Sequence, residues 1–513
     1  MRIPAIVGAA APVILVVGLA SPAAAATCEG LRSLSLRNVT VTQATVVAAG
    51  QFSPQGAGGA VPAAAAKLPA FCRVAATLTP TRDSDIKIEV WMPSQGWNGK
   101  FLGVGNGGWA GNISYPAMAE SLGRGYAVAS TDTGHTGNGG DASFALGHPE
   151  KLIDFGYRAV HEMTAAAKAF VRAFYDSAPR FSYWNGCSTG GKQGLTEAQR
   201  FPADYDGIIA GAPANNWTRL MTGLLWAGRA TLSDPASRIP AEKLGVLNRA
   251  ALNACDARDG VTDGVIDDPR DCRFDPQVVM CKAGDAADCL TNAQVESARK
   301  IYGPATNPRT REALFPGLPP GSELGWGPAA GGPAPFPIPD SHFKYVVFED
   351  PKWDFRTLDF DRDVARAERV DNRTLTATNP DLTAFIKRGG KLLIYHGWND
   401  QLITAQNSVN YYESVRSTMG AARTENSVRL FMAPGMAHCS GGSGPNQADW
   451  LATLEQWVER GVAPARIIAS RATNGAIDRT RPLCPYPQVA QYSGKGSTDD
   501  AANFSCIVPN AKR

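Results

Sequence analysis

Residues 186–191 carry the sequence GCSTGG, a G-x-S-x-G motif whose serine is Ser188. A β-prone segment precedes the motif at residues 181–185, and a helical stretch follows it at residues 192–200. In a strand-turn-helix of this kind the serine lies on a sharp, strained turn, so the flanking positions must be glycine. The N-terminus of the following helix favours negative charge on a reacting oxygen. The motif predicts Ser188 as a nucleophile, the alternative being a chance match in a chain with 53 glycines.

A serine hydroxyl is a weak nucleophile and needs a general base that an acidic residue orients. For a serine in a strand-turn-helix, the acid and then the histidine come later in the chain. Three histidines follow Ser188: His342, His396 and His438. Asp400 follows a predicted strand, and His438, the one histidine beyond it, follows the next. The order predicts Asp400 as the orienting acid and His438 as the base. The alternatives are a turn role for Asp400 and structural hydrogen bonds for His396 or His438.

The chain contains ten cysteines, an even number that suggests pairing in an oxidising compartment. Cys187 directly precedes Ser188, and Cys439 directly follows His438. If the serine and the histidine lie within hydrogen-bond reach, these two neighbours are close enough for a disulfide. The bond would fix the distance from Ser188 to His438, where small misplacements cost large rate factors. Closing a loop of about 250 residues would also stabilise the fold by roughly 5 kcal/mol.

The composition limits the kind of protein that can hold these residues. The chain has 513 residues, 44% of them hydrophobic and 19% charged, with 50 basic and 47 acidic side chains. Disordered, collagen-like and coiled-coil chains need a stronger bias and are excluded. A net charge of +3 creates no general field for nucleic acid or an anionic membrane, and neither is predicted as a partner.

Apolar runs that alternate with helical stretches must position the motifs. Residues 88–92, 126–130, 391–395 and 428–432 are typical of buried strands, and residues 157–176 carry the i, i+3/i+4 stripe of a helix. The alternation predicts an α/β fold with a mainly parallel sheet flanked by helices. Its two parts span residues 27–214 and 378–513. Between them, residues 215–377 do not show the alternation of strands and helices, and residues 315–340 are rich in proline and glycine. This change predicts a large inserted lid domain.

The N-terminus is typical of a secretory signal peptide over residues 1–26. Arg2 is its lone charge, residues 6–19 are mostly apolar, and three alanines precede Thr27 and Cys28. The alternative is a short membrane anchor, but the apolar run is below the roughly 20 residues that a spanning helix needs. We therefore predict cleavage near Ala26 and a secreted or periplasmic protein.

Three motifs together resemble those of the tannase and feruloyl esterase family. They are GCSTGG at 186–191, HGWND at 396–400 and the pair His438-Cys439. The family's hallmark is a disulfide between the residue before the catalytic serine and the residue after the catalytic histidine. The resemblance covers nearly the whole mature chain. It implies an α/β-hydrolase core with a lid, and Ser188, Asp400 and His438 as the triad. It also implies five disulfides: Cys28 with Cys72, Cys187 with Cys439, Cys255 with Cys272, Cys281 with Cys289, and Cys484 with Cys506.

Residues 105–111, GNGGWAG, are similar to the oxyanion loop of that family. Flexible backbone there can direct an amide N–H at a developing oxyanion, and the resemblance assigns this role to Gly108, with the N–H of Thr189 as its partner. The alternative is a phosphate-binding glycine loop. Such a loop should open a helix within a dinucleotide unit, and residues 112–116 do not begin one.

Residues 255–268, CDARDGVTDGVIDD, form an acid-rich loop between two cysteines, Cys255 and Cys272. Clustered carboxylates with glycines suit a hard cation, calcium above all, although the spacing is not that of an EF-hand. The resemblance implies a structural calcium site away from Ser188. Its ligands would be the carboxylates of Asp256, Asp259 and Asp263 and the main-chain oxygens of Val261 and Val265. The alternative is a solvated acidic loop.

The resemblance implies a secreted serine carboxylic ester hydrolase that works through an acyl-enzyme. Its expected substrates are small aromatic esters of the feruloyl type, free or attached to plant polysaccharide. Galloyl esters, as for a tannase, and terephthalate half-esters are the alternatives. Lid aromatics such as Trp326 and Phe336 are candidate walls of the acyl pocket. A serine peptidase is a further alternative, and an inactive calcium-dependent carbohydrate-binding protein is the alternative from a different class.

Overall fold

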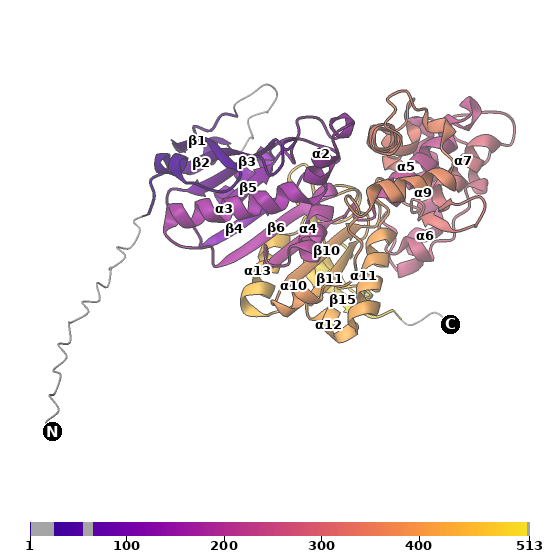
Figure 1. Cartoon of the computed structure of the whole chain (residues 1–513). Coiled ribbons are helices and arrows are strands. Elements are labelled where there is room, and N and C mark those ends of the chain that lie inside the picture. The colour runs from indigo at the N-terminus through magenta and orange to yellow at the C-terminus, as the bar shows by residue number, and fades with distance from the viewer. Residues whose placement is uncertain (2–24, 55–64, 510–513) are drawn as a thin grey trace.

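A nine-stranded sheet forms the centre of the molecule in the computed structural model, which describes residues 1, 25–54 and 65–509 (Figure 1). In sheet order the strands are β1 (Val39–Val47), β2 (Phe71–Leu78), β3 (Ile86–Pro93), β5 (Ala127–Thr131), β4 (Lys100–Val104), β6 (Phe181–Cys187), β7 (Gly207–Gly211), β10 (Lys391–Gly397) and β11 (Val428–Ala433). The strands from β5 to β11 are parallel, whereas β1, β2 and β3 extend the sheet with antiparallel pairing. The predicted mainly parallel sheet is confirmed. The predicted signal peptide lies almost wholly outside the described residues.

Helices cover both faces of this sheet. One face carries α3 (Ala159–Tyr175), α4 (Thr189–Arg200), α10 (Thr383–Lys387) and α11 (Gln406–Met419), and the other carries α1 (Tyr115–Gly123) and α13 (Trp450–Arg460). Ile208 of β7 packs in the first of these cores and Ile209 in the second, because successive side chains of a strand point to opposite faces. Burial on both faces is the reason that the central strands are continuous apolar runs.

Local sequence signals set the ends of the helices. The side chain of Asp449 caps α13 by accepting a hydrogen bond from the N–H of Ala452 (2.9 Å), and Gly461 ends the helix with φ +70°. The predicted helix over residues 157–176 corresponds to α3, which a single π-helical turn over Asp154–Arg158 precedes. Two further short helices are α2 (Pro149–Ile153) and α12 (Ala421–Glu425).

A helical layer is inserted between β7 and β10 and lies beyond one end of the sheet (Figure 1). Its elements are α5 (Trp217–Leu232), α6 (Ala241–Cys255), α7 (Asn292–Tyr302), β8 (Ala305–Thr306), β9 (Ala313–Phe315), α8 (Pro337–Ser341) and α9 (Arg362–Asp371). The N–H of Ala377 donates to the carbonyl of Asn215 (2.7 Å), so the segment leaves and re-enters the core at one point. The sequence pattern predicts an inserted lid here but does not predict that its helices bury apolar cores of their own.

Five disulfides are present in the implied pairing. They join Cys28 with Cys72, Cys187 with Cys439, Cys255 with Cys272, Cys281 with Cys289, and Cys484 with Cys506. The last of them ties the C-terminal hairpins β12 (Ile467–Thr473) with β13 (Ala476–Leu483) and β14 (Val489–Tyr492) with β15 (Phe504–Ile507).

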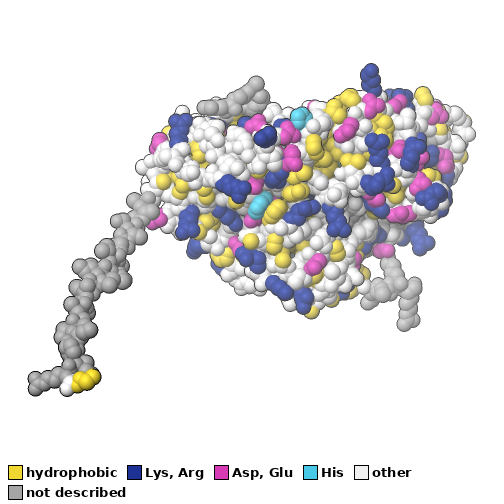
Figure 2. All heavy atoms as spheres, in the orientation of Figure 1, with side chains coloured by type: hydrophobic (Ala, Val, Ile, Leu, Met, Phe, Trp, Pro, Cys, Tyr) yellow, Lys and Arg dark blue, Asp and Glu magenta, His cyan; other side chains and the backbone are white. Residues whose placement is uncertain are grey.

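The visible surface mixes both signs of charge rather than forming one large basic or acidic face (Figure 2). This distribution agrees with the near-neutral net charge. Within the described ranges, none of the helices has the length and apolar character needed to cross a membrane.

Candidate active site

The structure places Ser188 on a strained turn between β6 and α4. Its backbone has φ +63° and ψ −122°, a region that residues with a side chain seldom adopt. The Ser188 N–H is fixed by the carbonyl of Gly211 at 2.9 Å. A Cβ on Gly186 would lie 2.5 Å from the carbonyl carbon of Gly190, so the turn can form only with glycine there. This geometry presents the serine side chain at the carboxyl end of the parallel strands.

Asp400 and His438 form a hydrogen-bonded pair on the loops after β10 and β11. His438 Nδ1 lies 2.7 Å from Asp400 Oδ2, and the Asp400 side chain is fully buried. Burial by itself would raise the pKa of Asp400, but the two neighbouring imidazoles outweigh it and hold the pKa below its ordinary value. Burial lowers the pKa of His438, and the Asp400 charge more than offsets this, so the pKa is raised. The pair has the electrostatics of a base and its orienting acid.

A second histidine, His396 at the end of β10, holds the other side of Asp400. Its Nε2 lies 3.0 Å from Asp400 Oδ2 and 2.7 Å from the Ile403 carbonyl, and its Nδ1 lies 2.7 Å from Ser408 Oγ. Because both neighbours of Nε2 are acceptors, Nε2 carries the proton and Nδ1 accepts from the hydroxyl. From the order of residues in the chain, His396 is expected to form structural hydrogen bonds only. In the structure, its hydrogen bond to Asp400 holds the carboxylate in place.

The backbone completes the shell around Asp400. Asp400 Oδ1 accepts hydrogen bonds from the N–H groups of Leu402 and Ile403, both at 2.9 Å. The two oxygens together therefore accept four hydrogen bonds, which matches the lone pairs of an ionised carboxylate. The backbone N–H of His438 is held in turn by Gln401 Oε1 at 3.2 Å. These contacts fix the imidazole relative to the acid before any substrate binds.

The disulfide between Cys187 and Cys439 joins the turn of the serine to the loop of the histidine, with 5.9 Å between the two Cα atoms. It connects positions 252 residues apart in the chain. Among the described residues, no side-chain hydrogen bond reaches Ser188 Oγ, and the contact between a catalytic serine and its base often tightens only when substrate binds. The bridge therefore joins the two loops covalently, directly beside Ser188 on one and His438 on the other.

The predicted oxyanion loop lies against the start of α4. Gly108 has φ +54°, and a Cβ there would collide with the carbonyl oxygen of Gly139. Thr189 Oγ1 donates to the Gly108 carbonyl at 2.9 Å, which couples the two loops. Thr189 is the first residue of α4, so its N–H has no acceptor within the helix. Both candidate oxyanion donors therefore flank Ser188.

Comparison with known proteins shows the family to which the chain belongs. The family model for tannase and feruloyl esterase matches residues 72–507. The chain belongs to this family. An uncharacterized esterase of Xanthomonas campestris pv. campestris is 41% identical, over 95% of this chain and 92% of that protein. A probable feruloyl esterase B-1 of Aspergillus flavus is 35% identical, over 85% of this chain and 86% of that protein. The crystal structure of feruloyl esterase B from Aspergillus oryzae superposes with a TM-score of 0.88 at 32% identity, covering 94% of this chain and 99% of that one.

The lid of this tannase-family chain touches the oxyanion loop through α8. Trp109 Nε1 donates to the Ile338 carbonyl at 3.1 Å, and the Ile338 side chain would lie 3.1 Å from a Cβ on Gly108. Phe336, at the start of this segment, is partly buried beside it. Trp326, by contrast, is fully buried in the lid's own core and donates to Ser322 Oγ at 2.9 Å. The expectation that Trp326 lines the acyl pocket is wrong, because its ring packs inside the core of the lid.

The acid-rich lid loop folds around its own carboxylates. Asp256 accepts hydrogen bonds from the N–H groups of Asp263 (3.2 Å) and Gly264 (2.9 Å), and Asp259 accepts one from Val261 (2.9 Å). The Asp263 carboxylate pairs with two arginines of β13, Arg481 at 2.6 Å and Arg479 at 3.2 Å. The arginines therefore anchor the loop to the C-terminal hairpin, a contact that the sequence pattern does not predict.

A small cavity beside this loop is lined by three carboxylates, one arginine and apolar side chains: Asp259, Asp263, Asp267, Arg481, Val265, Pro434, Pro445 and Leu483. Burial raises the pKa of Asp267 to about 7, and repulsion from Asp259 adds to the effect. A cation bound here would offset the repulsion between Asp259 and Asp267, and an all-oxygen donor set is the type that calcium takes. Asp267 is a carboxylate at this cavity that the predicted ligand set lacks. In the described structure, no three of the loop's carboxylates have oxygens within 4.8 Å of one another, so calcium binding here would need the loop to draw its carboxylates closer and stays a prediction.

Loss of the bridge between Cys187 and Cys439 is expected to lower kcat/KM by about 100-fold, because the serine and histidine loops would no longer be held in register. The test is the C187A/C439A double variant, assayed with an aryl ester at a temperature where it remains folded. The C484A/C506A variant is the matched control, since it removes a bridge whose cysteines adjoin no triad residue in the chain, and it should keep the wild-type rate. An unchanged kcat/KM in C187A/C439A would contradict the role of the bridge as an active-site clamp.

Proposed function

We propose that this chain hydrolyses esters of aromatic acids of the feruloyl type through an acyl-enzyme on Ser188. The observation that carries the proposal is the buried pair of Asp400 and His438, which the bridge from Cys439 to Cys187 ties to the strained turn of the serine. As a member of the tannase and feruloyl esterase family, the chain is a carboxylic ester hydrolase. The relatives named as feruloyl esterases support the choice of acyl group.

The reaction follows from the charges of the site. His438 Nε2 accepts the proton of Ser188 Oγ as the oxygen attacks the ester carbonyl, and Asp400 stabilises the imidazolium that forms. The N–H groups of Gly108 and Thr189 hold the oxyanion. The imidazolium then gives its proton to the leaving alcohol, which yields the acyl-enzyme. Water, deprotonated by His438, attacks this ester and releases the acid and free Ser188.

The lid supplies the contacts next to the reacting carbonyl. α8 places Ile338 beside Gly108 and Phe336 nearby, so an acyl group bound to the site would meet apolar lid side chains. An aromatic acyl group suits such a wall, because rings bury a large apolar area for little conformational entropy. Feruloyl groups on plant polysaccharide carry the sugar chain on the alcohol side of the ester, away from this contact.

A panel of four esters tests this function. Methyl ferulate is expected to give the highest kcat/KM, ahead of methyl caffeate, methyl gallate and the mono(hydroxyethyl) ester of terephthalate. A higher kcat/KM for gallate would make the protein a tannase, and one for the terephthalate half-ester would make it a hydrolase of that substrate. A serine-directed phosphonate should add its mass to Ser188. Failure of both labelling and hydrolysis would leave the carbohydrate-binding alternative.

We further propose that the lid loop holds a structural calcium ion through Asp256, Asp259, Asp263 and the main-chain oxygens of Val261 and Val265. The ion would add positive charge to a loop that Arg479 and Arg481 neutralise only in part. It has no step in the ester reaction. Its expected contribution is to hold the loop against the C-terminal hairpin and so to stabilise the lid.

Removal of calcium is expected to lower the melting temperature by a few degrees, because a ligand present at about 100 times its Kd stabilises the folded state by roughly 2.7 kcal/mol. Differential scanning calorimetry with EGTA and with added calcium measures the shift. D259N should abolish the calcium-dependent part of the shift, whereas D288N, at an exposed acid elsewhere in the lid, should retain it. Equal melting temperatures of the wild type with and without EGTA would remove the calcium proposal.

Export is the remaining proposal. The five disulfides fit an oxidising compartment such as the periplasm or the extracellular space. The N-terminal signal peptide over residues 1–26 would direct the chain there. Mass spectrometry of the mature protein, with its N-terminus near Thr27, tests this proposal.

A further inference from the structure

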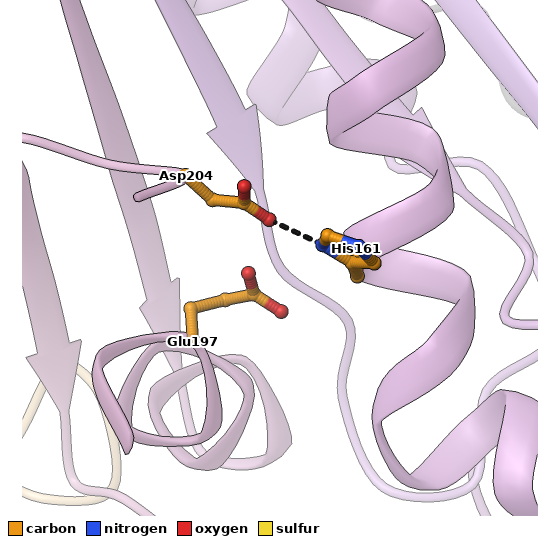
Figure 3. A group of neighbouring side chains, drawn as sticks. All are labelled: His161, Glu197 and Asp204. Carbon is orange, nitrogen blue, oxygen red and sulfur yellow. Dashed lines mark hydrogen bonds and ion pairs between the residues drawn. The ribbon is translucent and has the colours of Figure 1, made fainter. Parts of the chain in front are cut away.

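Three side chains of the types that bind metals converge on the sheet face covered by α3 and α4 (Figure 3). His161 comes from α3, Glu197 from the last turn of α4, and Asp204 from the loop between α4 and β7. Each offers an atom within 4.8 Å of the other two, and no other such trio of His, Cys, Asp or Glu occurs in the part of the chain that the structure describes. The ester reaction uses none of the three.

Glu197 is the unusual member of this cluster. Its side chain is 1% exposed, and neither carboxylate oxygen has a hydrogen-bond partner. A buried carboxylate without a partner is costly, so the charge must be neutralised by a proton or by a cation. The nearest ammonium, that of Lys168, donates to the backbone carbonyl of Asp204 and not to either carboxylate. Among the described residues no N–H or ammonium group donates to the Glu197 carboxylate. It faces Asp204 and His161 (Figure 3), so the two neighbouring carboxyl groups must share either a proton or a cation.

The other two members are held in place and reachable from solvent. His161 Nδ1 lies 2.7 Å from Asp204 Oδ2. The His161 ring stacks on Phe201, with 3.9 Å between the ring centroids and 9° between the planes, so the direction of its nitrogens is fixed. The side chains of His161 and Asp204 are 35% and 15% exposed. An ion can therefore enter from the surface and meet the buried carboxylate last.

We propose that His161, Glu197 and Asp204 bind a divalent transition-metal ion, of which zinc fits the donor set best. Imidazole nitrogen and carboxylate oxygen are both ligand types that zinc takes in proteins, and water would complete the coordination. In a tetrahedral site, ligand atoms about 2.0–2.2 Å from the ion lie roughly 3.3–3.6 Å apart. The three side chains, whose ligand atoms lie within 4.8 Å of one another, would therefore need to close by up to about an ångström. Calcium takes oxygen ligands only, so this site differs in chemistry from the lid loop.

Binding would require a small rearrangement and would act on stability. The contact between His161 and Asp204 must open by roughly half an ångström to admit a tetrahedral ion, which side-chain rotation allows. The ion would tie α3 to α4 and to the loop before β7. Glu197 lies nine residues beyond Ser188, roughly 13 Å along the helix, so the ion touches no reacting atom.

The test is calorimetric titration of the chelator-stripped full-length protein with zinc chloride, with calcium in excess to fill other oxygen sites. The wild type is expected to bind one zinc ion with micromolar or tighter affinity and to melt at a higher temperature with zinc. E197Q and H161N are each expected to weaken binding by about 100-fold. E197Q keeps the shape of the side chain and removes an unpartnered charge, so it should fold even if H161N disturbs the packing on Phe201.

H148N is the matched control. His148 forms an exposed pair with Asp83 at 2.9 Å but is not part of a trio of ligand-type side chains, so its variant should bind zinc like the wild type. Absence of zinc binding by the wild type would overturn the proposal and assign a proton to the Glu197 carboxylate. Equal affinities of the wild type and E197Q would also overturn it, because the zinc would then lie elsewhere.

Discussion

Replacement of Ser188 by alanine is expected to lower kcat for methyl ferulate by about 10⁵- to 10⁶-fold, because the variant cannot form the acyl-enzyme. The oxyanion donors and the binding surface remain, so a small rate above that of water alone should persist. Initial rates at saturating substrate measure kcat, and KM should change little, since the serine hydroxyl contributes mainly to the transition state. The variant should also fail to take up the phosphonate label.

S182A is the control for this result. Ser182 lies on the same strand, β6, and is buried, so its replacement tests whether a small change in that strand alone affects the rate. It should retain the kcat of the wild type. A rate for S188A above about one hundredth of the wild-type rate would exclude Ser188 as the nucleophile.

The second large effect is expected at Asp400, where D400N should lower kcat by about 10⁴-fold. The amide removes the charge that stabilises the His438 imidazolium, and its NH₂ group can hold the imidazole in the wrong tautomer. Among the described residues, Asp400 is the acid that pairs with His438, so we expect no second carboxylate to supply the lost charge. D449N, at an exposed helix cap, is the matched control and should leave kcat unchanged.

The pH profile separates this role from a merely structural one. Asp400 raises the pKa of His438, and the imidazole must be neutral to accept the serine proton, so wild-type kcat/KM should fall as the pH drops through that raised pKa. In D400N the pKa of His438 is lowered, and the acid limb of the residual activity should move to lower pH. An acid limb at the same pH in both proteins would show that Asp400 does not act on His438.

Several features of the site depended only on short-range sequence. The glycines around Ser188 are dictated by the turn itself, because a Cβ on Gly186 has no room. The carboxyl ends of neighbouring parallel strands meet at one edge of a sheet, so the loops after β10 and β11 place Asp400 near His438 once the strands are recognised. The position of Cys187 and Cys439 beside these residues then made their pairing predictable.

Other features required the folded chain. His396 precedes Asp400 by four residues, yet its role depends on the path of the loop that brings the Ile403 carbonyl and Ser408 against its ring. The pairing of Asp263 with Arg479 and Arg481 joins segments more than 200 residues apart, and no spacing rule reaches that far. The helices of the lid are likewise stabilised by burial against one another, which a proline- and glycine-rich sequence does not reveal.

The sequence by itself therefore predicted the mainly parallel sheet and the bridge between Cys187 and Cys439, both of which the structure confirms, and it named Ser188, Asp400 and His438 as the residues to test. Each of these features depends on residue types at fixed short spacings or on the order of strands along the chain. Both can be read from the sequence without knowledge of the fold. Only the tertiary structure decided which side chains surround Asp400, which arginines hold the acidic loop, and that Glu197 is buried beside His161 and Asp204. Those contacts form when segments distant in the chain pack together. A polar or charged group buried in this way must find a partner, and which partner it finds depends on the fold rather than on local sequence.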